Sequence, residues 1–139
     1  MNQSTDYAIQ MLLYLAQAAQ TVPSSKLSAA LGISSRYLLQ IGARLRDTGL
    51  LQVSYGNFGG YVLTKSPGEI TLFEVVNLME RKTLSQKHSA TMEREKSFST
   101  LETAYEYISV ITEKIMKSIT IESILKQKTD QWYLAEYCL

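Results

Sequence analysis

The residue pair best suited to chemistry in this chain is Arg36 and Gln40, an arginine and a glutamine four positions apart. Four positions are about one turn of an α-helix, so both side chains lie on one face of a helix that spans them. An arginine can donate two hydrogen bonds to guanine, and a glutamine can pair in the same bidentate way with adenine. The pair can therefore read base edges in DNA; the alternative is that it belongs to a solvated helix surface.

The helix that must carry this pair is predicted from Ser35 to about Thr48, with Ser34 as its N-cap and Gly49 at its end. Its apolar residues recur at spacings of three and four, which turns them toward a core and leaves the opposite face outside. The candidate DNA contacts on or beside that outer face are Ser34, Ser35, Arg36, Tyr37, Gln40 and Arg44.

The segments around this helix predict a helix-turn-helix followed by a hairpin. A first helix ends near Thr21, and a short second helix follows two serines and ends at Gly32, an arrangement typical of the helix-turn-helix motif. Residues 51–55 and 61–64 alternate around a glycine-rich loop and predict a β-hairpin, and a fourth helix is predicted over residues 71–81. We therefore expect a mainly α fold with a small β-hairpin, that is, a winged helix-turn-helix domain.

The hairpin and the turn after it supply the remaining candidate DNA contacts. Glycine lets a backbone approach a sugar-phosphate chain closely, because it has no side chain in the way. These candidates are Tyr55, Asn57, Gly59, Gly60 and Lys65.

Positive charge is concentrated in the same region. The whole chain has 14 basic and 13 acidic residues, for a formal net charge of +1. Residues 26–65 hold five basic residues and one acid, for +4, so the rest of the chain carries −3. This asymmetry either marks a segment that binds a polyanion or is ordinary scatter.

A long amphipathic helix of about 22 residues is predicted from Phe98 onward. We expect its apolar stripe to pair two copies of the chain, the alternative being that it packs on its own domain. The predicted dimerisation residues are Phe98, Leu101, Tyr105, Ile108, Ile111, Ile115 and Ile119. The predicted division is a DNA-binding domain at 1–81, a linker at 82–97 and a dimerisation segment at 98–139.

Few residues suit catalysis or metal binding. The chain has one histidine, His88, in the predicted linker, and one cysteine, Cys138, which together make neither a catalytic dyad nor a metal site. Cys138 is either an oxidisable thiol that serves as a redox switch or an inert packing residue. No apolar run approaches the ~20 residues of a membrane helix, and no signal-peptide pattern is present. We expect a cytoplasmic protein that is not an enzyme and binds no metal or membrane.

Three stretches resemble one known family. Residues 33–40 (ISSRYLLQ), 45–51 (LRDTGLL) and 56–63 (GNFGGYVL) resemble the I-S-x-x-Y-L-x-Q, L-R-x-x-G-L and G-x-x-G-G-Y-x-L motifs of the Rrf2 family of bacterial transcription regulators. The resemblance implies a DNA-binding homodimer in which the long helix pairs the subunits.

The chain departs from that family in two ways. Members that sense through an iron–sulfur cluster carry three cysteines between the fourth helix and the dimer helix, and residues 81–100 contain none. We therefore expect no such cluster and no other cofactor. Members of the family often have an arginine at the base of the wing, and Tyr55 stands there instead, so we expect little base readout by the wing.

The sequence as a whole predicts a sequence-specific DNA-binding regulator. We expect a repressor that acts as a homodimer on a pseudo-palindromic site in double-stranded DNA. The alternative is a protein-interaction module that keeps the winged-helix fold and docks a partner protein, with vestigial DNA binding. The near-neutral net charge supports this alternative.

Overall fold

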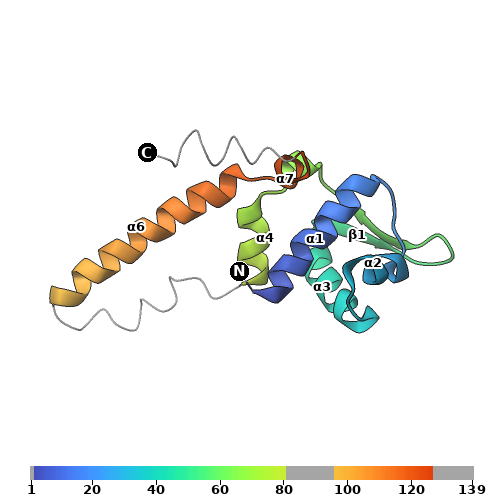
Figure 1. The fold of residues 1–139 in the computed structure, drawn as a ribbon, viewed down its shortest axis with the longest axis horizontal. Coiled ribbons are helices and arrows are strands. Elements are labelled where there is room, and N and C mark those ends of the chain that lie inside the picture. Colours follow the sequence, from blue (N-terminus) through green and yellow to red (C-terminus); the bar gives the residue numbers. More distant parts are fainter. Residues whose placement is uncertain (1, 81–95, 127–139) are drawn as a thin grey trace.

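The structure is a computed structural model that describes residues 2–80 and 96–126 (Figure 1). The described part is mainly helical with one two-stranded antiparallel hairpin, which confirms the predicted fold class. The elements in chain order are α1 (Gln3–Ala18), α2 (Ser24–Leu31), α3 (Ser35–Asp47), β1 (Leu51–Ser54), β2 (Gly60–Leu63), the short 3-10 turn η1 (Pro67–Glu69), α4 (Leu72–Met79), α6 (Lys96–Ser118) and α7 (Ile121–Leu125).

Side-chain caps set the starts of the helices that matter most for function. The Ser34 hydroxyl accepts a hydrogen bond from the Tyr37 amide at 3.1 Å and begins α3, as predicted. The Thr71 hydroxyl accepts from the Glu74 amide at 3.2 Å and begins α4. A capping box at Thr120 begins α7. Each cap satisfies an amide that has no partner inside its helix.

One hydrophobic core holds α3 in place against α1, α4 and the hairpin. Leu38, Ile41 and Leu45 of α3 are all buried in it, as their spacing predicts. Ile121 of α7 is also fully buried, and its amide donates to the Ile70 carbonyl at 2.9 Å. Residues beyond α6, which the sequence assigned to the dimerisation segment, therefore return to the N-terminal core.

The hairpin is anchored along its β2 edge. β1 and β2 pair in antiparallel register, with Val53 opposite Tyr61. On the other edge of β2, Tyr61 exchanges two backbone hydrogen bonds of 2.9 Å with Val22, in the connection between α1 and α2. The hairpin base is thus paired on both sides of β2, and the loop beyond it extends away from the domain (Figure 1).

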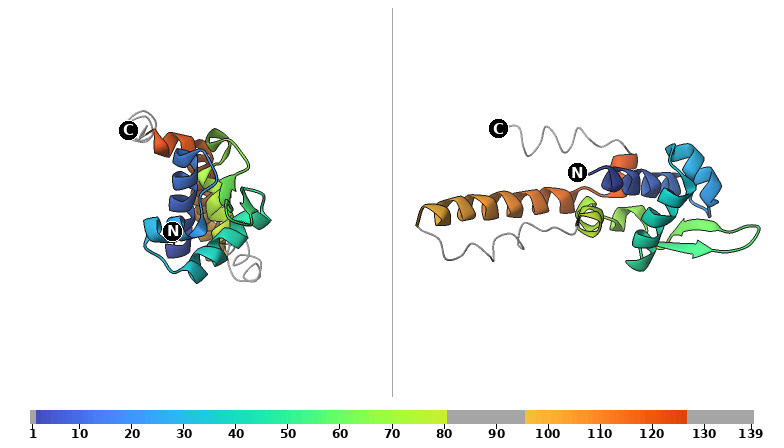
Figure 2. Two further views of the ribbon diagram at one scale, coloured as in Figure 1. Left: turned by 90° about the vertical axis from the view of Figure 1, so that its right-hand side faces the viewer. Right: turned by 90° about the horizontal axis from the view of Figure 1, so that it is seen from below.

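Helix α6 extends from the domain on the side opposite the hairpin (Figures 1 and 2). Its C-terminal end is attached to α4, because the Leu72 amide donates to the Ile119 carbonyl at 2.8 Å and the Lys117 ammonium lies 4.8 Å from the centre of the Phe73 ring. The rest of α6 projects beyond the other described helices. Helices α3 and α6 therefore lie in separate parts of the molecule.

Several predicted features lie outside the described residues: most of the linker at 82–97, with His88, and the tail with Cys138. The side chain of Phe98 is also outside the description. Within residues 2–80 and 96–126, no helix combines the length and apolar content needed to cross a bilayer.

Candidate nucleic-acid interface

The outer face of α3 presents the two side chains that can read bases. Arg36 and Gln40 are both exposed, one turn apart, on the side of α3 away from its buried stripe. Ser35 and Leu39 are also exposed there, and the Leu39 side chain is 54% accessible. The structure thus brings together on one surface the polar pair that the sequence singled out, with an apolar neighbour suited to a thymine methyl group.

The start of α3 is fixed by an aromatic contact that the sequence did not suggest. The Tyr37 ring meets the Tyr7 ring of α1 edge to face, with ring centres 5.8 Å apart and an interplanar angle of 89°. Ser34 is occupied as the N-cap of the same helix. Both residues remain candidate phosphate contacts, and both hold the N-terminal turn of α3 in place.

Arg44 has a different partner from the one expected. Its guanidinium donates to the carbonyl oxygens of Leu78 and Met79, both at 3.1 Å, at the C-terminal end of α4. Helix-end carbonyls lack partners within the helix and carry partial negative charge, so they attract a guanidinium. Arg44 therefore ties α3 to α4, and a DNA contact by this exposed side chain stays a prediction.

Lys65 is paired as well. Its ammonium lies 3.0 Å from a carboxylate oxygen of Glu74 in α4, and both side chains are partly exposed. A surface ion pair of this kind contributes at most about 1 kcal/mol, so a DNA phosphate can replace the carboxylate at little cost. Lys65 therefore stays a candidate phosphate contact.

The fold itself requires glycine at two positions of the wing. Gly60 is buried, has φ +151°, and its Cα faces the Val22 carbonyl so closely that a Cβ would collide with it. A Cβ on Gly59 would collide with the Ser54 carbonyl inside the hairpin. The backbone that Gly60 approaches thus belongs to its own chain, and a DNA contact by either glycine stays a prediction. Tyr55 and Asn57 are exposed on the loop, as a DNA contact requires.

The wing is also locked to α3 through Tyr61. The Tyr61 side chain is almost fully buried, and its ring lies so close to Gly42 of α3 that a Cβ there would be 2.8 Å from it. Burial raises the pKa of the Tyr61 phenol above its ordinary value, although nearby Arg46 lowers it in part, so the ring remains neutral. The hairpin and α3 therefore pack together as one unit.

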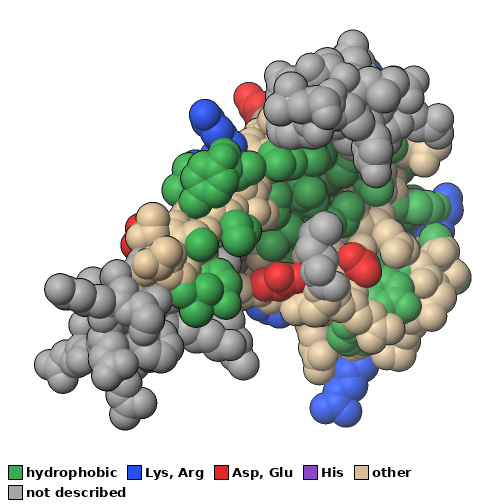
Figure 3. All heavy atoms as spheres, turned by 60° about the vertical axis from the view of Figure 1, so that its left-hand side comes forward, with side chains coloured by type: hydrophobic (Ala, Val, Ile, Leu, Met, Phe, Trp, Pro, Cys, Tyr) green, Lys and Arg blue, Asp and Glu red, His purple; other side chains and the backbone are tan. Residues whose placement is uncertain are grey.

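The outer part of α6 has large apolar side chains in contact with solvent. Of the predicted dimerisation stripe, Ile108 is 54% exposed and Leu101 is 48% exposed, while Ile115 and Ile119 are half-buried near α4. Tyr107 and Val110 extend the apolar surface around the helix, which the sequence reading missed. Figure 3 shows hydrophobic side chains along one face of the long helix and a further hydrophobic area on the body of the domain.

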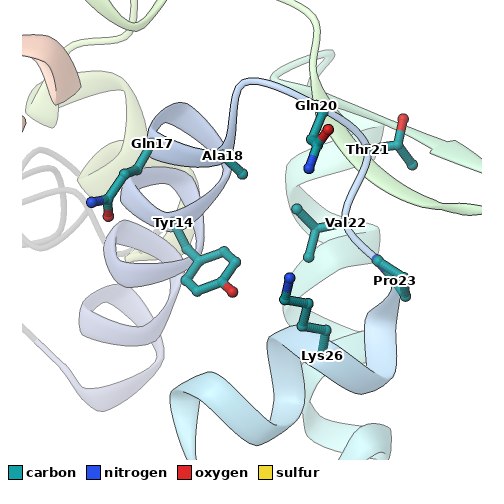
Figure 4. Close-up of a pocket in the computed structure, with 8 residues that line it drawn as sticks. All are labelled: Tyr14, Gln17, Ala18, Gln20, Thr21, Val22, Pro23 and Lys26. Atoms are coloured by element: carbon teal, nitrogen blue, oxygen red, sulfur yellow. The ribbon is translucent and has the colours of Figure 1, made fainter.

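A hollow of about 320 Å³ lies between the end of α1 and the start of α2. The Tyr14 hydroxyl and the Lys26 ammonium border it, together with the amides of Gln17 and Gln20 (Figure 4). This set contains no carboxylate, thiol or imidazole that could pair with the tyrosine or the lysine.

The donor set of the chain does not fit an iron–sulfur cluster. A cluster is held by about four cysteine thiolates, or by two cysteines and two histidines. The whole sequence contains one cysteine and one histidine. Among the residues that the structure describes, no three histidine, cysteine, aspartate or glutamate side chains gather in a group able to hold a metal ion.

Comparison with known proteins identifies the same architecture. A family model, Rrf2, described as an iron-dependent transcriptional regulator, matches residues 1–127. The HTH-type transcriptional regulator IscR of Enterobacter sp. strain 638 is 38% identical over 76 residues, which are 53% of this chain and 47% of that protein. Protein aau3 of Rhizobium meliloti is 33% identical over 81 residues, 58% of this chain and 53% of that protein. The chain thus matches about half the length of these curated relatives.

Solved structures agree over nearly the whole fold. T. potens IscR is 25% identical, with a TM-score of 0.69, and the match covers 99% of this chain and 93% of that one. CymR, the global cysteine regulator of B. subtilis, is 21% identical, with a TM-score of 0.72 over 91% of this chain and 96% of that one. The family model and the IscR relative are both described as transcriptional regulators, which agrees with the prediction that the chain is not an enzyme.

Proposed function

Because the chain belongs to the Rrf2 family of transcriptional regulators, we propose that it binds double-stranded DNA as a homodimer and represses transcription. The observation that carries this proposal is the outer face of α3. Arg36 and Gln40 are exposed one turn apart on a helix whose other face is buried and whose first turn is capped. Such a helix fits the major groove with its N-terminal half toward the bases.

The exposed apolar stripe of α6 supports the proposed homodimer. This stripe suits a second copy of the same helix, since a symmetric pair buries the same patch on both subunits. Two α3 helices related by a two-fold axis then meet half-sites about one DNA turn apart, ~34 Å. The operator is accordingly pseudo-palindromic, and a dimer bound there blocks access to a promoter. The proposal places this regulator in the cytoplasm.

The second candidate is a protein-interaction module that docks a partner through the same fold. Two observations favour it: the net charge is only +1, and residues 51–63 of the wing carry no charged side chain. DNA binding by a neutral protein depends on its local +4 region, so the two functions are separated by measuring selectivity for DNA sequence.

Alanine at Arg36 or Gln40 tests the role of α3. Each variant should lose about 1–3 kcal/mol of discrimination between the preferred duplex and a scrambled one, because one bidentate base contact is removed. Lys65→Ala is the matched control: it should weaken both duplexes equally and make the salt dependence shallower. Titration of fluorescent duplexes at several salt concentrations measures both effects. Equal loss on both duplexes for Arg36→Ala and Gln40→Ala contradicts the assigned base contacts.

We further propose that this regulator works without the iron–sulfur cluster associated with its family. One cysteine and one histidine cannot supply the ligands. The protein purified without oxygen should be colourless, contain no stoichiometric iron or sulfide, and bind DNA equally well after treatment with an iron chelator. A visible iron–sulfur absorption band that disappears with chelation would refute this proposal.

A further inference from the structure

The loop of the wing carries two aromatic rings that nothing in the described structure covers: Tyr55, directly after β1, and Phe58, further along the loop. Phe58 is 95% exposed and Tyr55 is 85% exposed, and both lie on the five-residue loop between β1 and β2. A single exposed apolar side chain is ordinary in proteins. Two almost fully solvated rings on one short loop are a concentrated apolar surface of the kind that binds a partner.

The loop that holds these rings is rigid with respect to α3. The Gly59 amide donates to the Gly56 carbonyl at 3.0 Å and closes the turn. Below the loop, Tyr61 pairs with Val22 through two backbone hydrogen bonds and packs its ring on Gly42 of α3. The backbone of the loop is therefore held in place relative to α3.

The reach of the hairpin determines what the tip meets when α3 lies in the major groove. Each strand has four residues, about 13 Å at 3.4 Å per residue, and the loop extends beyond the domain on the side away from α6 (Figures 1 and 2). The hairpin begins three residues after α3 and packs against it. This length is comparable to the ~12 Å width of the major groove, so it is long enough for the loop to extend past one phosphate backbone to the neighbouring minor groove, which is about 6 Å wide.

The chemistry of the tip selects one way of binding there. A minor groove is usually read by an arginine or lysine drawn to its negative potential, and residues 51–63 contain neither. The remaining mode is an apolar wedge, in which a side chain such as phenylalanine enters between base pairs and partly unstacks them.

We propose that Phe58, on the same loop as Tyr55, inserts into the minor groove next to each half-site and unstacks a base step. This inference rests on the proposed function, since it requires α3 to occupy the major groove. The wedge favours sites with a flexible pyrimidine–purine step at that position, so it adds specificity outside the bases that α3 touches. Because the contact is uncharged, its contribution does not depend on salt.

The test uses the full-length homodimer and the duplex that the wild type enriches from a random pool. Phe58→Ala should weaken binding about tenfold, the effect of removing one buried aromatic side chain, with the slope of affinity against salt unchanged. Phe58→Leu should retain part of the affinity. Phe58→Arg should bind with a slope steeper by about 0.9 per subunit, because it adds a phosphate contact. Gln52→Ala, on the exposed side of β1, is the control in the same hairpin.

A second measurement reports the unstacking directly. 2-Aminopurine placed in turn at the steps flanking each half-site should brighten at one step when wild type binds and stay dark with Phe58→Ala. If Phe58→Ala changes neither affinity nor fluorescence while the wild type still binds its selected duplex, the insertion of Phe58 is overturned but the proposed function is not. That result would favour a protein partner for the loop. Failure of the wild type to bind any duplex would overturn both the wedge and the proposed function.

Discussion

Replacing Ile108 with glutamate should convert the homodimer into monomers and abolish tight binding to a two-fold symmetric operator. Ile108 lies in the middle of the apolar stripe of α6 and is 54% exposed in the single chain, so the change leaves the fold of one subunit intact. In a symmetric helix pair, the new carboxylate is buried close to its own copy. Burying an unpaired charge costs at least roughly 3 kcal/mol, which corresponds to more than a hundredfold in the dimer constant.

Two variants on the same helix make this result interpretable. Ser109→Glu adds the same charge one position along, on the side of α6 that carries Glu102 and Glu106, and should leave the dimer intact. Ile108→Leu keeps the apolar volume and should behave as wild type. Sedimentation of the three proteins gives the masses, and DNA titration gives the affinities. A dimer of normal stability for Ile108→Glu would show that α6 does not form the interface.

The second large effect is expected at Gly60, where alanine should destabilise the whole domain. Its φ of +151° is a conformation that side chains rarely adopt, and its Cβ would collide with the Val22 carbonyl. The clash breaks the backbone pairing between Val22 and Tyr61 and loosens the wing from α3. We expect a loss of about 2–5 kcal/mol in the free energy of unfolding, a large part of the stability of a domain of this size.

Gly56→Ala is the matched control for that prediction. Gly56 also has a positive φ, +101°, but no atom lies within 4 Å of the position its Cβ would take. The control should therefore lose about 1 kcal/mol from backbone strain alone. Urea unfolding followed by circular dichroism measures both variants. Equal losses for the two alanines would show that the approach to Val22 does not matter, and that backbone strain explains both.

Local features of the fold followed from the sequence because they depend on neighbouring residues. The cap at Ser34 was predicted and confirmed, and so was the buried stripe of α3. Element ends were less accurate. The fourth helix was predicted to reach Arg81 and ends at Met79, where carbonyl oxygens bind Arg44 instead of continuing the helix.

Features that join distant parts of the chain were not visible in the sequence. Arg44 looked like another outward cation of α3, because its partners lie 34 and 35 positions away on α4. Gly60 looked like a residue free to approach DNA, because its contact with Val22 depends on how the hairpin folds back on the α1–α2 connection. The sequence did not predict the exposure of the Phe58 ring, because only the folded loop shows that it is uncovered. Contacts between residues that are far apart in the sequence are therefore the ones that local sequence patterns do not predict.

Repeated selection from a pool of random duplexes at moderate salt tests whether α3 makes this chain a reader of DNA sequence. We expect an enriched motif with two similar half-sites about one turn apart. The motif should contain guanine and adenine positions, and the preference for these bases should disappear with Arg36→Ala or Gln40→Ala. If no motif is enriched and the pool is bound equally by the wild type and both variants, α3 does not read DNA sequence. That result would favour the protein-docking alternative.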